Sequence, residues 1–391
     1  MHLKSYLSAA LYGLPALALD AAASSTSNSP AVDPFKVYTI TAENITAKLI
    51  PYGARLTSLL VPDRDGNEQD VVVGYDDPKD YLKDTETDHT FFGAVVGRYA
   101  NRIKNGTFQI DGDNDVGYDQ RNWTVTAQSD SSITFTLLDR ALEGFPGDVI
   151  THAVFSVDSD VTAENPKGLP QLTTKLISLA LTEKTPIMTA NHIYWNLNAF
   201  KETNVLNDTF LQLPLSKRLV GTDGILIPNG TILGVDSYDG AADFTTGKLV
   251  GKDIEKAAGL CGTDCTGYDN CFIVDRDNAY GSSNSMVPVV RMNSSTTGIS
   301  MEVASNQQAV QIYSCVGQKG NIAIKPSQAK RNKEEGIEGA KAVNKYGCIV
   351  IETEGWIDGI NNPEWGQLSD QIYSPTGAPA VNWATYKFGT V

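Results

Sequence analysis

The sequence predicts an all-β fold, either a sandwich or a barrel, and three observations support this prediction. Several segments alternate apolar and polar side chains with the two-residue period of half-buried antiparallel strands, namely residues 132–137, 153–157 and 176–181. Turn-forming pairs punctuate the chain at short intervals, and they are Asp65-Gly66, Asn105-Gly106, Pro146-Gly147 and Asn229-Gly230. No repeat and no long helical stripe is present, so we expect only one short, peripheral helix, within residues 248–258.

The N-terminal residues have the pattern of a secretory signal peptide. After a short basic start, an apolar run over residues 6–19 is too short to span a bilayer comfortably, and small residues follow at 21–25. No Pro/Ser-rich linker interrupts the rest of the chain. We therefore expect a secreted, extracellular protein with a signal peptide at 1–20, a polar leader at 21–35 and a single domain at 36–391.

Composition and charge exclude several classes of function. With 391 residues and 41% hydrophobic residues, the chain has enough apolar side chains for a large core. A net charge of -15 argues against nucleic acid as a partner, because the phosphates would be repelled. After the signal peptide, no apolar run is long enough to predict a membrane span. Glycosylation sequons are compatible with secretion, and they begin at Asn44, Asn105, Asn122, Asn207, Asn229 and Asn293.

The cysteines predict a local disulfide. They are Cys261, Cys265, Cys271, Cys315 and Cys348. In an oxidising compartment, this odd number leaves at least one thiol unpaired or held deep in the core. The first three lie close together but form no Cys-x2-Cys pair and have no histidine nearby, so we expect a disulfide there and no metal site.

Histidine titrates near neutrality and can serve as a general acid or base, so each histidine after the leader is a candidate. His152 lies in a plain strand and is expected to be structural, and His89 lies in a predicted loop. His192 is the functional candidate, because residues 191–197 are rich in amide and aromatic groups of the kind that bind the hydroxyls and C–H faces of sugars. A structural role for His192 is the alternative.

Glu352 is a second candidate, since it follows the apolar residues 349–351 directly. Partial desolvation of its carboxylate would raise its pKa and suit base catalysis. The alternative is that Glu352 points to solvent on an alternating strand.

Residues 97–103 contain two arginines four positions apart, Arg98 and Arg102, beside Asn101. Arginine presents a fixed fork of donors to hydroxyl or carboxylate oxygens, which makes this segment a candidate for binding. A surface ion pair is the alternative, in particular for Arg98.

Taken in order, nine motifs resemble those of the aldose 1-epimerase, or galactose mutarotase, family, and suggest a secreted, fungal-type member. Together they cover nearly the whole chain after the leader. The motifs are YGARL at 52–56, DVVVGY at 70–75, FGAVVGRYANRI at 92–103, GFPG at 144–147, NHIYWNL at 191–197, IPNG at 227–230, GYDN at 267–270, VQIY at 310–313, and Glu352-Thr353 with Asp358, Asn361 and Pro363.

This resemblance implies a large antiparallel β-sandwich of the galactose mutarotase type, a supersandwich. It implies His192 as the general acid and Glu352 as the general base, and it assigns the binding of the sugar's hydroxyls to Asn101, Arg102, Asp269 and Gln311. The implied substrate is a free aldose such as galactose or glucose, whose α and β anomers interconvert by ring opening and closure, with protons exchanged at opposite sides of the hemiacetal. No metal, nucleotide or redox cofactor is expected.

The chain departs from the family pattern at two places. The family has a His-Gly-Gly motif whose histidine helps to bind the sugar, but here Gly112 runs directly into residues 113–119, and Trp123 follows. Either the loss is genuine and weakens binding, or an exon segment has been missed, and sequencing the transcript across codons 108–120 decides between these hypotheses. Glu354 stands where the family commonly has glutamine and adds a carboxylate near the proposed base.

Three other functions compete with this interpretation. A non-catalytic or weakly active sugar-binding sandwich is the main alternative, because the His-Gly-Gly motif is missing. A glycoside hydrolase is less favoured, although two carboxylates that flank a sugar would suffice for it. A hexose-6-phosphate epimerase is disfavoured, because no cluster of basic residues is present for the phosphate.

Overall fold

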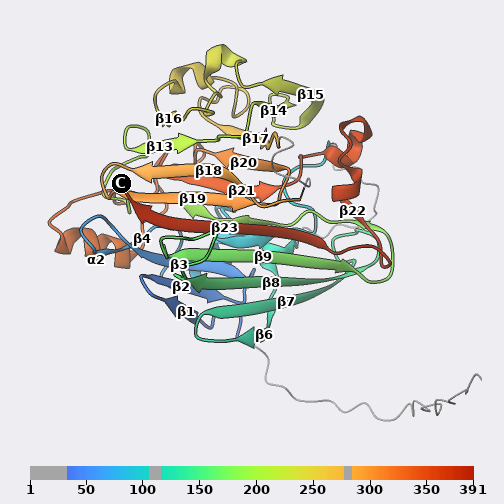
Figure 1. Cartoon of the computed structure of the whole chain (residues 1–391), viewed down its shortest axis with the longest axis horizontal. Coiled ribbons are helices and arrows are strands. Elements are labelled where there is room, and N and C mark those ends of the chain that lie inside the picture. The colour runs from blue at the N-terminus through green and yellow to red at the C-terminus, as the bar shows by residue number, and fades with distance from the viewer. Residues whose placement is uncertain (1–32, 105–115, 277–283) are drawn as a thin grey trace, which may run out of the picture. The chain divides into compact units, whose positions relative to one another are not determined.

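A computed structural model of the chain describes residues 33–104, 116–276 and 284–391. Most of these residues lie in antiparallel strands (Figure 1). The strands are β1 Tyr38–Ala42, β2 Ile45–Ile50, β3 Arg55–Pro62, β4 Glu68–Asp70, β5 Ala94–Val96, β6 Thr124–Gln128, β7 Ser132–Arg140, β8 Asp148–Asp158, β9 Gln171–Ala180, β10 Thr185–Pro186, β11 Ala190–His192, β12 Tyr194–Trp195, β13 Thr209–Gln212, β14 Arg218–Thr222, β15 Pro228–Gly234, β16 Lys248–Leu249, β17 Asp269–Ile273, β18 Val287–Ser294, β19 Ile299–Ser305, β20 Ala309–Tyr313, β21 Ile349–Glu354, β22 Ile372–Tyr373 and β23 Ala380–Thr390. The α-helices are α1 Asp80–Glu86 and α2 Pro326–Glu334, and the short 3₁₀ turns are Tyr118–Gln120, Tyr238–Gly240, Ile254–Ala257, Gly359–Asn361, Pro363–Trp365 and Leu368–Asp370.

Most of the described strands form three large sheets, and β5 with β11 and β10 with β22 form two small ones. A nine-stranded sheet has the order β16-β13-β18-β19-β23-β9-β8-β7-β6, a six-stranded sheet the order β12-β21-β20-β17-β14-β15, and a four-stranded sheet the order β1-β2-β3-β4. Figure 1 shows the long strands β7, β8, β9 and β23 of the first sheet side by side. The alternation predicted for these segments is confirmed, because β7, β8 and β9 bury every second side chain.

All three sheets share one hydrophobic core. Leu56 of β3, Phe155 of β8 and Ile351 of β21 are fully buried and belong to the same cluster of apolar side chains. A half-buried sheet must cover its apolar face with another layer, so the nine-stranded sheet packs against the other two. The predicted all-β sandwich is therefore confirmed, and it is a sandwich rather than a barrel.

The turn predictions are partly confirmed. Asp65-Gly66 lies in the hairpin between β3 and β4, and Pro146-Gly147 lies in the connection from β7 to β8. The prediction for Asn229-Gly230 is wrong, since this pair lies within β15 at a bulge. The adjacent turn is made by Asp223, whose Oδ1 accepts hydrogen bonds from the backbone N–H groups of Ile225 and Ile227. The predicted turn at Asn105-Gly106 lies outside the described residues.

The helix prediction is also corrected. Residues 248–258 form the short strand β16 and a 3₁₀ turn at Ile254–Ala257 instead of a helix. The α-helices of the described residues, α1 and α2, lie elsewhere, and both are short. Helices of this length are marginal in isolation and depend on tertiary contacts, which a local sequence pattern does not reveal.

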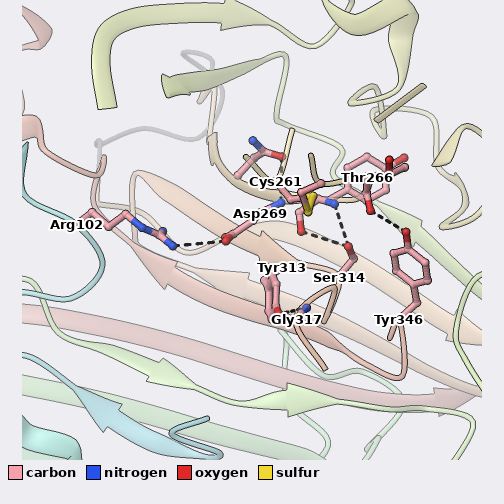
Figure 2. The surroundings of a disulfide bond; sticks show 11 residues. Arg102, Cys261, Thr266, Asp269, Tyr313, Ser314, Gly317 and Tyr346 are labelled. Atoms are coloured by element: carbon pink, nitrogen blue, oxygen red, sulfur yellow. Dashed lines mark hydrogen bonds and ion pairs between the residues drawn. A yellow bond between two sulfur atoms is a disulfide. The ribbon is translucent and has the colours of Figure 1, made fainter. Parts of the chain in front are cut away.

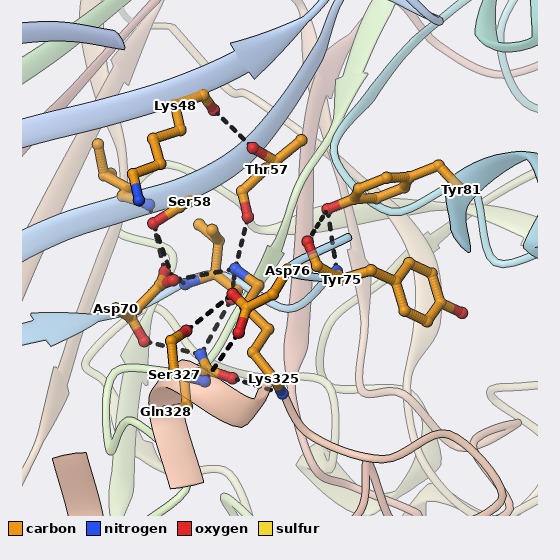
Figure 3. A network of polar contacts seen from close by, with 12 residues as sticks. Lys48, Thr57, Ser58, Asp70, Tyr75, Asp76, Tyr81, Lys325, Ser327 and Gln328 are labelled. Carbon is orange, nitrogen blue, oxygen red and sulfur yellow. Dashed lines mark hydrogen bonds and ion pairs between the residues drawn. The ribbon is translucent and has the colours of Figure 1, made fainter. Parts of the chain in front are cut away.

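A buried polar network anchors the start of α2 (Figure 3). The Lys325 Nζ ammonium donates to the carbonyl oxygens of Thr57 and Val72 and lies 3.0 Å from Asp70 Oδ2. Gln328, in the first turn of α2, donates its Nε2 to the Asp70 carbonyl oxygen at 3.0 Å. The three ammonium protons of the buried lysine therefore each have an acceptor, and the network joins α2 to β3 and β4.

The cysteines behave as their number predicts. Cys261 and Cys265 form the expected local disulfide. A second disulfide joins Cys315 to Cys348 across 33 positions, and Cys271 is a buried free thiol. Within the described ranges, no helix combines the length and the apolar character needed to cross a membrane.

Candidate active site

A cavity of about 490 Å³ collects the residues selected from the sequence. Its lining includes all of them, from separate segments of the chain, and they are Asn101, Arg102, His192, Asp269, Gln311 and Glu352. The fold thus places both catalytic candidates and the four binding candidates around one space.

The six-stranded sheet positions the carboxylates of this cavity. Glu352 lies on β21 directly opposite Gln311 of β20, which in turn lies opposite Cys271 of β17. Asp269 precedes Cys271 by two positions on β17, so its side chain lies on the same face of the sheet. Glu352 is only 6% exposed, which excludes the alternative that it points to solvent.

His192 reaches the same cavity from another sheet. It is the last residue of β11, which pairs with β5. The His192 Nδ1 atom lies 3.3 Å from the carbonyl oxygen of Phe91, and a carbonyl can only accept, so Nδ1 carries the proton there. In the neutral ring the unprotonated nitrogen is therefore Nε2, which lies 3.7 Å from Glu352 Oε1.

The His192–Glu352 distance determines how a sugar can meet the pair. A sugar atom placed on the line between the two groups would need about 5.5 Å, or two hydrogen-bond lengths. The observed 3.7 Å is too short for that arrangement. The two groups therefore lie side by side, and a bound sugar must lie over both of them rather than between them.

Burial favours the uncharged forms of both groups. It lowers the pKa of His192 to about 4 and raises the pKa of Glu352 to about 8, the latter with a further contribution from the negative charge of Asp269. Arg102 opposes the shift of Glu352. Between these values the pair holds one proton, and this proton lies on Glu352.

The four binding candidates are joined in one chain of polar contacts. Asn101 accepts a hydrogen bond on Oδ1 from Arg102 NH1 at 3.1 Å. Arg102 NH2 lies 3.5 Å from Asp269 Oδ2, the contact drawn in Figure 2. Gln311 donates its Nε2 to Asp269 Oδ1 at 2.6 Å, while its Oε1 has no partner among the described atoms. This set offers both donors and acceptors to the hydroxyls of a ligand.

Several lining residues were not selected from the sequence. Tyr194 and Tyr313 contribute aromatic rings to the cavity, and Asp119 contributes a buried carboxylate. Both tyrosines lie inside motifs already noted, but the face of a strand on which a side chain lies depends on a register that the sequence does not reveal. Phe91, Val96 and His89 complete this group, and His89 lies in a loop, as predicted.

Two other predictions near the site can be compared with the structure. Arg98 does form an ion pair, but it is a buried one, with NH2 2.6 Å from Asp139 Oδ2 and both side chains fully covered. The alternative of a surface ion pair for Arg98 is therefore wrong. His152 lies on β8, where its Nδ1 is 2.8 Å from Thr136 Oγ1, outside the cavity. The Gly112–Asp113 junction, where the family's His-Gly-Gly motif is missing from the sequence, lies outside the described residues.

Metal-binding geometry is not found in the part of the chain that the structure describes, where no three His, Cys, Asp or Glu side chains converge.

Comparisons with known proteins agree with this site. A family model described as aldose 1-epimerase matches residues 36–115 and 116–372. The probable aldose 1-epimerase of Arthroderma benhamiae is 58% identical over 386 residues, which cover 92% of this chain and 88% of that protein. The galactose mutarotase of Bos taurus is 26% identical over 350 residues, which cover 84% of this chain and 87% of that protein.

Among solved structures, the GalM/aldose epimerase homologue from C. elegans matches with a TM-score of 0.71 at 22% identity, covering 91% of this chain and 99% of that one. At this identity the likeness shows the fold, a β-sandwich of the galactose mutarotase type. The family model and the 58% identical relative show more, namely a mutarotase of the isomerase class. The resemblance inferred from the motifs is confirmed, and the chain belongs to the aldose 1-epimerase family.

Proposed function

We propose that this protein interconverts the α and β anomers of free hexoses such as galactose or glucose, with Glu352 and His192 as the acid/base pair. The observation that carries the proposal is the 3.7 Å separation of His192 Nε2 and Glu352 Oε1 in one sugar-sized cavity. The name of the galactose mutarotase from Bos taurus supports a hexose as substrate.

Side-by-side groups suit the hemiacetal, because its two reacting oxygens, the anomeric hydroxyl and the ring oxygen, are bonded to the same carbon. Glu352 removes the proton of the anomeric hydroxyl, and protonated His192 donates a proton to the ring oxygen, which opens the pyranose to the aldehyde. Rotation about the C1–C2 bond exposes the other face of the carbonyl. Reclosure with the roles reversed, in which His192 accepts and Glu352 donates, then gives the other anomer.

The position of the shared proton, on Glu352 or on His192, determines which half of the reaction the pair can start. The neutral pair, with the proton on Glu352, is the state that the open-chain aldehyde requires for reclosure. Opening a pyranose requires the charged pair, with the proton on His192. Arg102 favours this charged state, since its positive charge opposes the rise in the pKa of Glu352. We infer that hydroxyl contacts with the bound sugar complete the proton shift.

Polarimetry tests the proposal. Freshly dissolved α-glucose and α-galactose should reach equilibrium faster with the protein than by spontaneous mutarotation. A sugar-binding protein without catalysis would leave the spontaneous rate unchanged, and that result would overturn the proposal. A glycoside hydrolase would release new reducing ends from di- or polysaccharides, which an epimerase does not do.

We also propose that the chain folds in an oxidising, glycosylating compartment and is secreted. The disulfides Cys261–Cys265 and Cys315–Cys348 support this proposal. The sequon residues Asn44 and Asn207 are exposed and therefore accessible to glycosylation. Expression in a eukaryotic host should yield protein in the medium whose mass falls on treatment with a glycosidase specific for N-linked glycans. Retention inside the cell with an unchanged mass would contradict both parts.

A further inference from the structure

A second buried glutamate lies directly behind the proposed base. Glu354 is two residues after Glu352 on β21, so both side chains leave the strand on the same face. Glu354 is completely buried, and it does not line the cavity. A carboxyl group that is fully withdrawn from solvent beside another carboxyl group requires a physical explanation.

Among the described residues, only one of the two carboxyl oxygens of Glu354 has a hydrogen-bond partner. Its Oε1 accepts a hydrogen bond from Asn101 Nδ2 at 2.8 Å. Its Oε2 has no hydrogen-bond partner among the described residues. An unpaired oxygen that carries a charge is far more costly to bury than one in a neutral carboxyl group. The geometry therefore favours the protonated acid.

The charges around Glu354 also favour its protonated form. Burial and the carboxylate of Glu352 raise the pKa of Glu354, with a smaller contribution from Asp269. Arg102 is the only cation among the groups that influence it appreciably in the described chain. Tyr99 and Cys271 also interact with Glu354, and burial is the main cause of the raised pKa of each. Neighbouring carboxyl groups cannot both ionise cheaply in a buried site.

Glu354 contacts one of the sugar-binding candidates directly and a second one through it. Asn101 donates its Nδ2 to Glu354 Oε1, and its Oδ1 accepts a hydrogen bond from Arg102 NH1. Asn101 has a positive φ of 61°, a conformation that non-glycine residues adopt only when their surroundings support it. The hydrogen bond from Asn101 to Glu354 provides such support.

We propose that Glu354 is a positioning residue that works as an uncharged carboxylic acid: it fixes Asn101, and through it Arg102, and leaves Glu352 as the only carboxyl of the two that exchanges protons. This inference rests on the proposed epimerase function. Glu354 would act on the sugar only through Asn101 and Arg102.

Two variants distinguish the effect of the charge of Glu354 from its effect on the position of Asn101. Glu354→Gln keeps the size, the neutrality and the acceptor for Asn101, so its kcat and KM should remain within about twofold of the wild type, and the alkaline limb of its pH profile should not move. Glu354→Ala removes the acceptor, so KM should rise about tenfold with a smaller change in kcat, because binding loses a hydrogen-bonded partner. Thermal melts show whether each variant is folded, and rescue by glutamine distinguishes positioning from a general loss of stability.

Either of two kinetic results would overturn the proposal. An alkaline limb that moves to lower pH in Glu354→Gln would mean that Glu354 carries a negative charge in the wild type, because removing that charge lowers the pKa of Glu352. An unchanged KM in a folded Glu354→Ala variant would mean that Glu354 does not position Asn101.

Infrared difference spectroscopy tests the protonation state without any turnover. The wild-type minus Glu354→Gln spectrum at neutral pH should contain the C=O stretch of a protonated carboxyl group. The matched control is Glu302→Gln on β19, since the Glu302 side chain is 40% exposed and its Oε2 lies 3.0 Å from Arg291 Nε, and it should show the bands of an ionised carboxylate instead. Carboxylate bands for Glu354 would refute the proposal even if the epimerase assay succeeds. A protonated band without epimerase activity would refute the proposed function and leave the protonation of Glu354 supported.

Discussion

Two of the buried sets of charged groups in the described chain differ in how completely they are paired. In the network around Lys325, the ammonium group has three acceptors, and both carboxylate oxygens of Asp70 accept hydrogen bonds. Around Glu352, the contact to His192 is 3.7 Å long, and the described oxygens Gln311 Oε1 and Glu354 Oε2 have no partner.

This difference separates a structural cluster from a reactive one. A fully paired network fixes one conformation and has no hydrogen-bonding capacity left for a ligand. An incompletely paired set is less stable by itself, and a substrate can satisfy those of its free donors and acceptors that face the cavity, such as Gln311 Oε1. Mutations in the first set should therefore change stability, and mutations in the second should change activity.

The largest effect is expected at the reactive pair. Glu352→Gln and His192→Asn should each lower kcat/KM by about 10²- to 10⁴-fold, because each removes a group that transfers a proton. The melting temperature should hardly fall, since neither change leaves a buried charge unpaired. Polarimetry and thermal melts measure the two effects, and His152→Asn on β8 is the matched histidine control. Full activity of either variant would remove that residue from the mechanism.

The converse test is made at the structural network. Lys325→Met should lower the free energy of unfolding by about 3–5 kcal/mol, because Asp70 would remain buried without its cation. The folded fraction should keep its kcat/KM. Denaturant titration measures the loss, and Lys330→Met, on the exposed side of the same helix, should cost less than about 0.5 kcal/mol. Equal effects of the two substitutions would mean that the network does not stabilise the fold.

A smaller effect is expected among the binding residues. Asp269→Ala removes the acceptor of Gln311 and the partner of Arg102, so KM should rise about 10- to 100-fold. The negative charge of Asp269 also raises the pKa of Glu352, so the alkaline limb of activity should move to lower pH. Asp275→Ala, which removes an ion pair with Arg218 away from the cavity, is the control. An unchanged KM would exclude Asp269 from sugar binding.

The pH dependence of activity tests the protonation of the reactive pair, His192 and Glu352, without any mutation. Activity requires one proton on the pair, so it should fall on the acid side near pH 4, where His192 takes up a second proton, and on the alkaline side near pH 8, where Glu352 loses its own. Initial rates of mutarotation, corrected for the spontaneous reaction at each pH, give the profile of kcat/KM. A single acid limb without an alkaline one would contradict the one-proton pair.

Much of the fold could be predicted from the sequence, because its strands alternate clearly. β7 and β8 each bury one face, and the sequence shows this directly as an alternation of apolar and polar residues. The helices were missed, because α2 depends on Lys325 and on partners more than 250 positions away, such as Asp70 and Val72. The bulge that contains Asn229-Gly230 was also missed, since a bulge depends on the register with the partner strand.

The candidate site was predictable where chemistry and motif agreed. Glu352 stood out as a carboxylate at the end of an apolar run, and His192 as an imidazole among amides and aromatics. The burial of Arg98 was not predictable, because it depends on Asp139, which is 41 positions away in the sequence. The contact of Glu354 with Asn101 joins residues 253 positions apart and likewise requires the folded chain.

The second disulfide has a consequence for the integrity of the chain. β20 ends at Tyr313 and β21 begins at Ile349, so Cys315–Cys348 closes the base of the excursion that contains α2. A protease that cut this excursion would leave the two polypeptide fragments covalently linked next to Gln311 and Glu352. The cleaved enzyme would therefore migrate as one species until it is reduced, and its reaction centre would not lose either strand by dissociation.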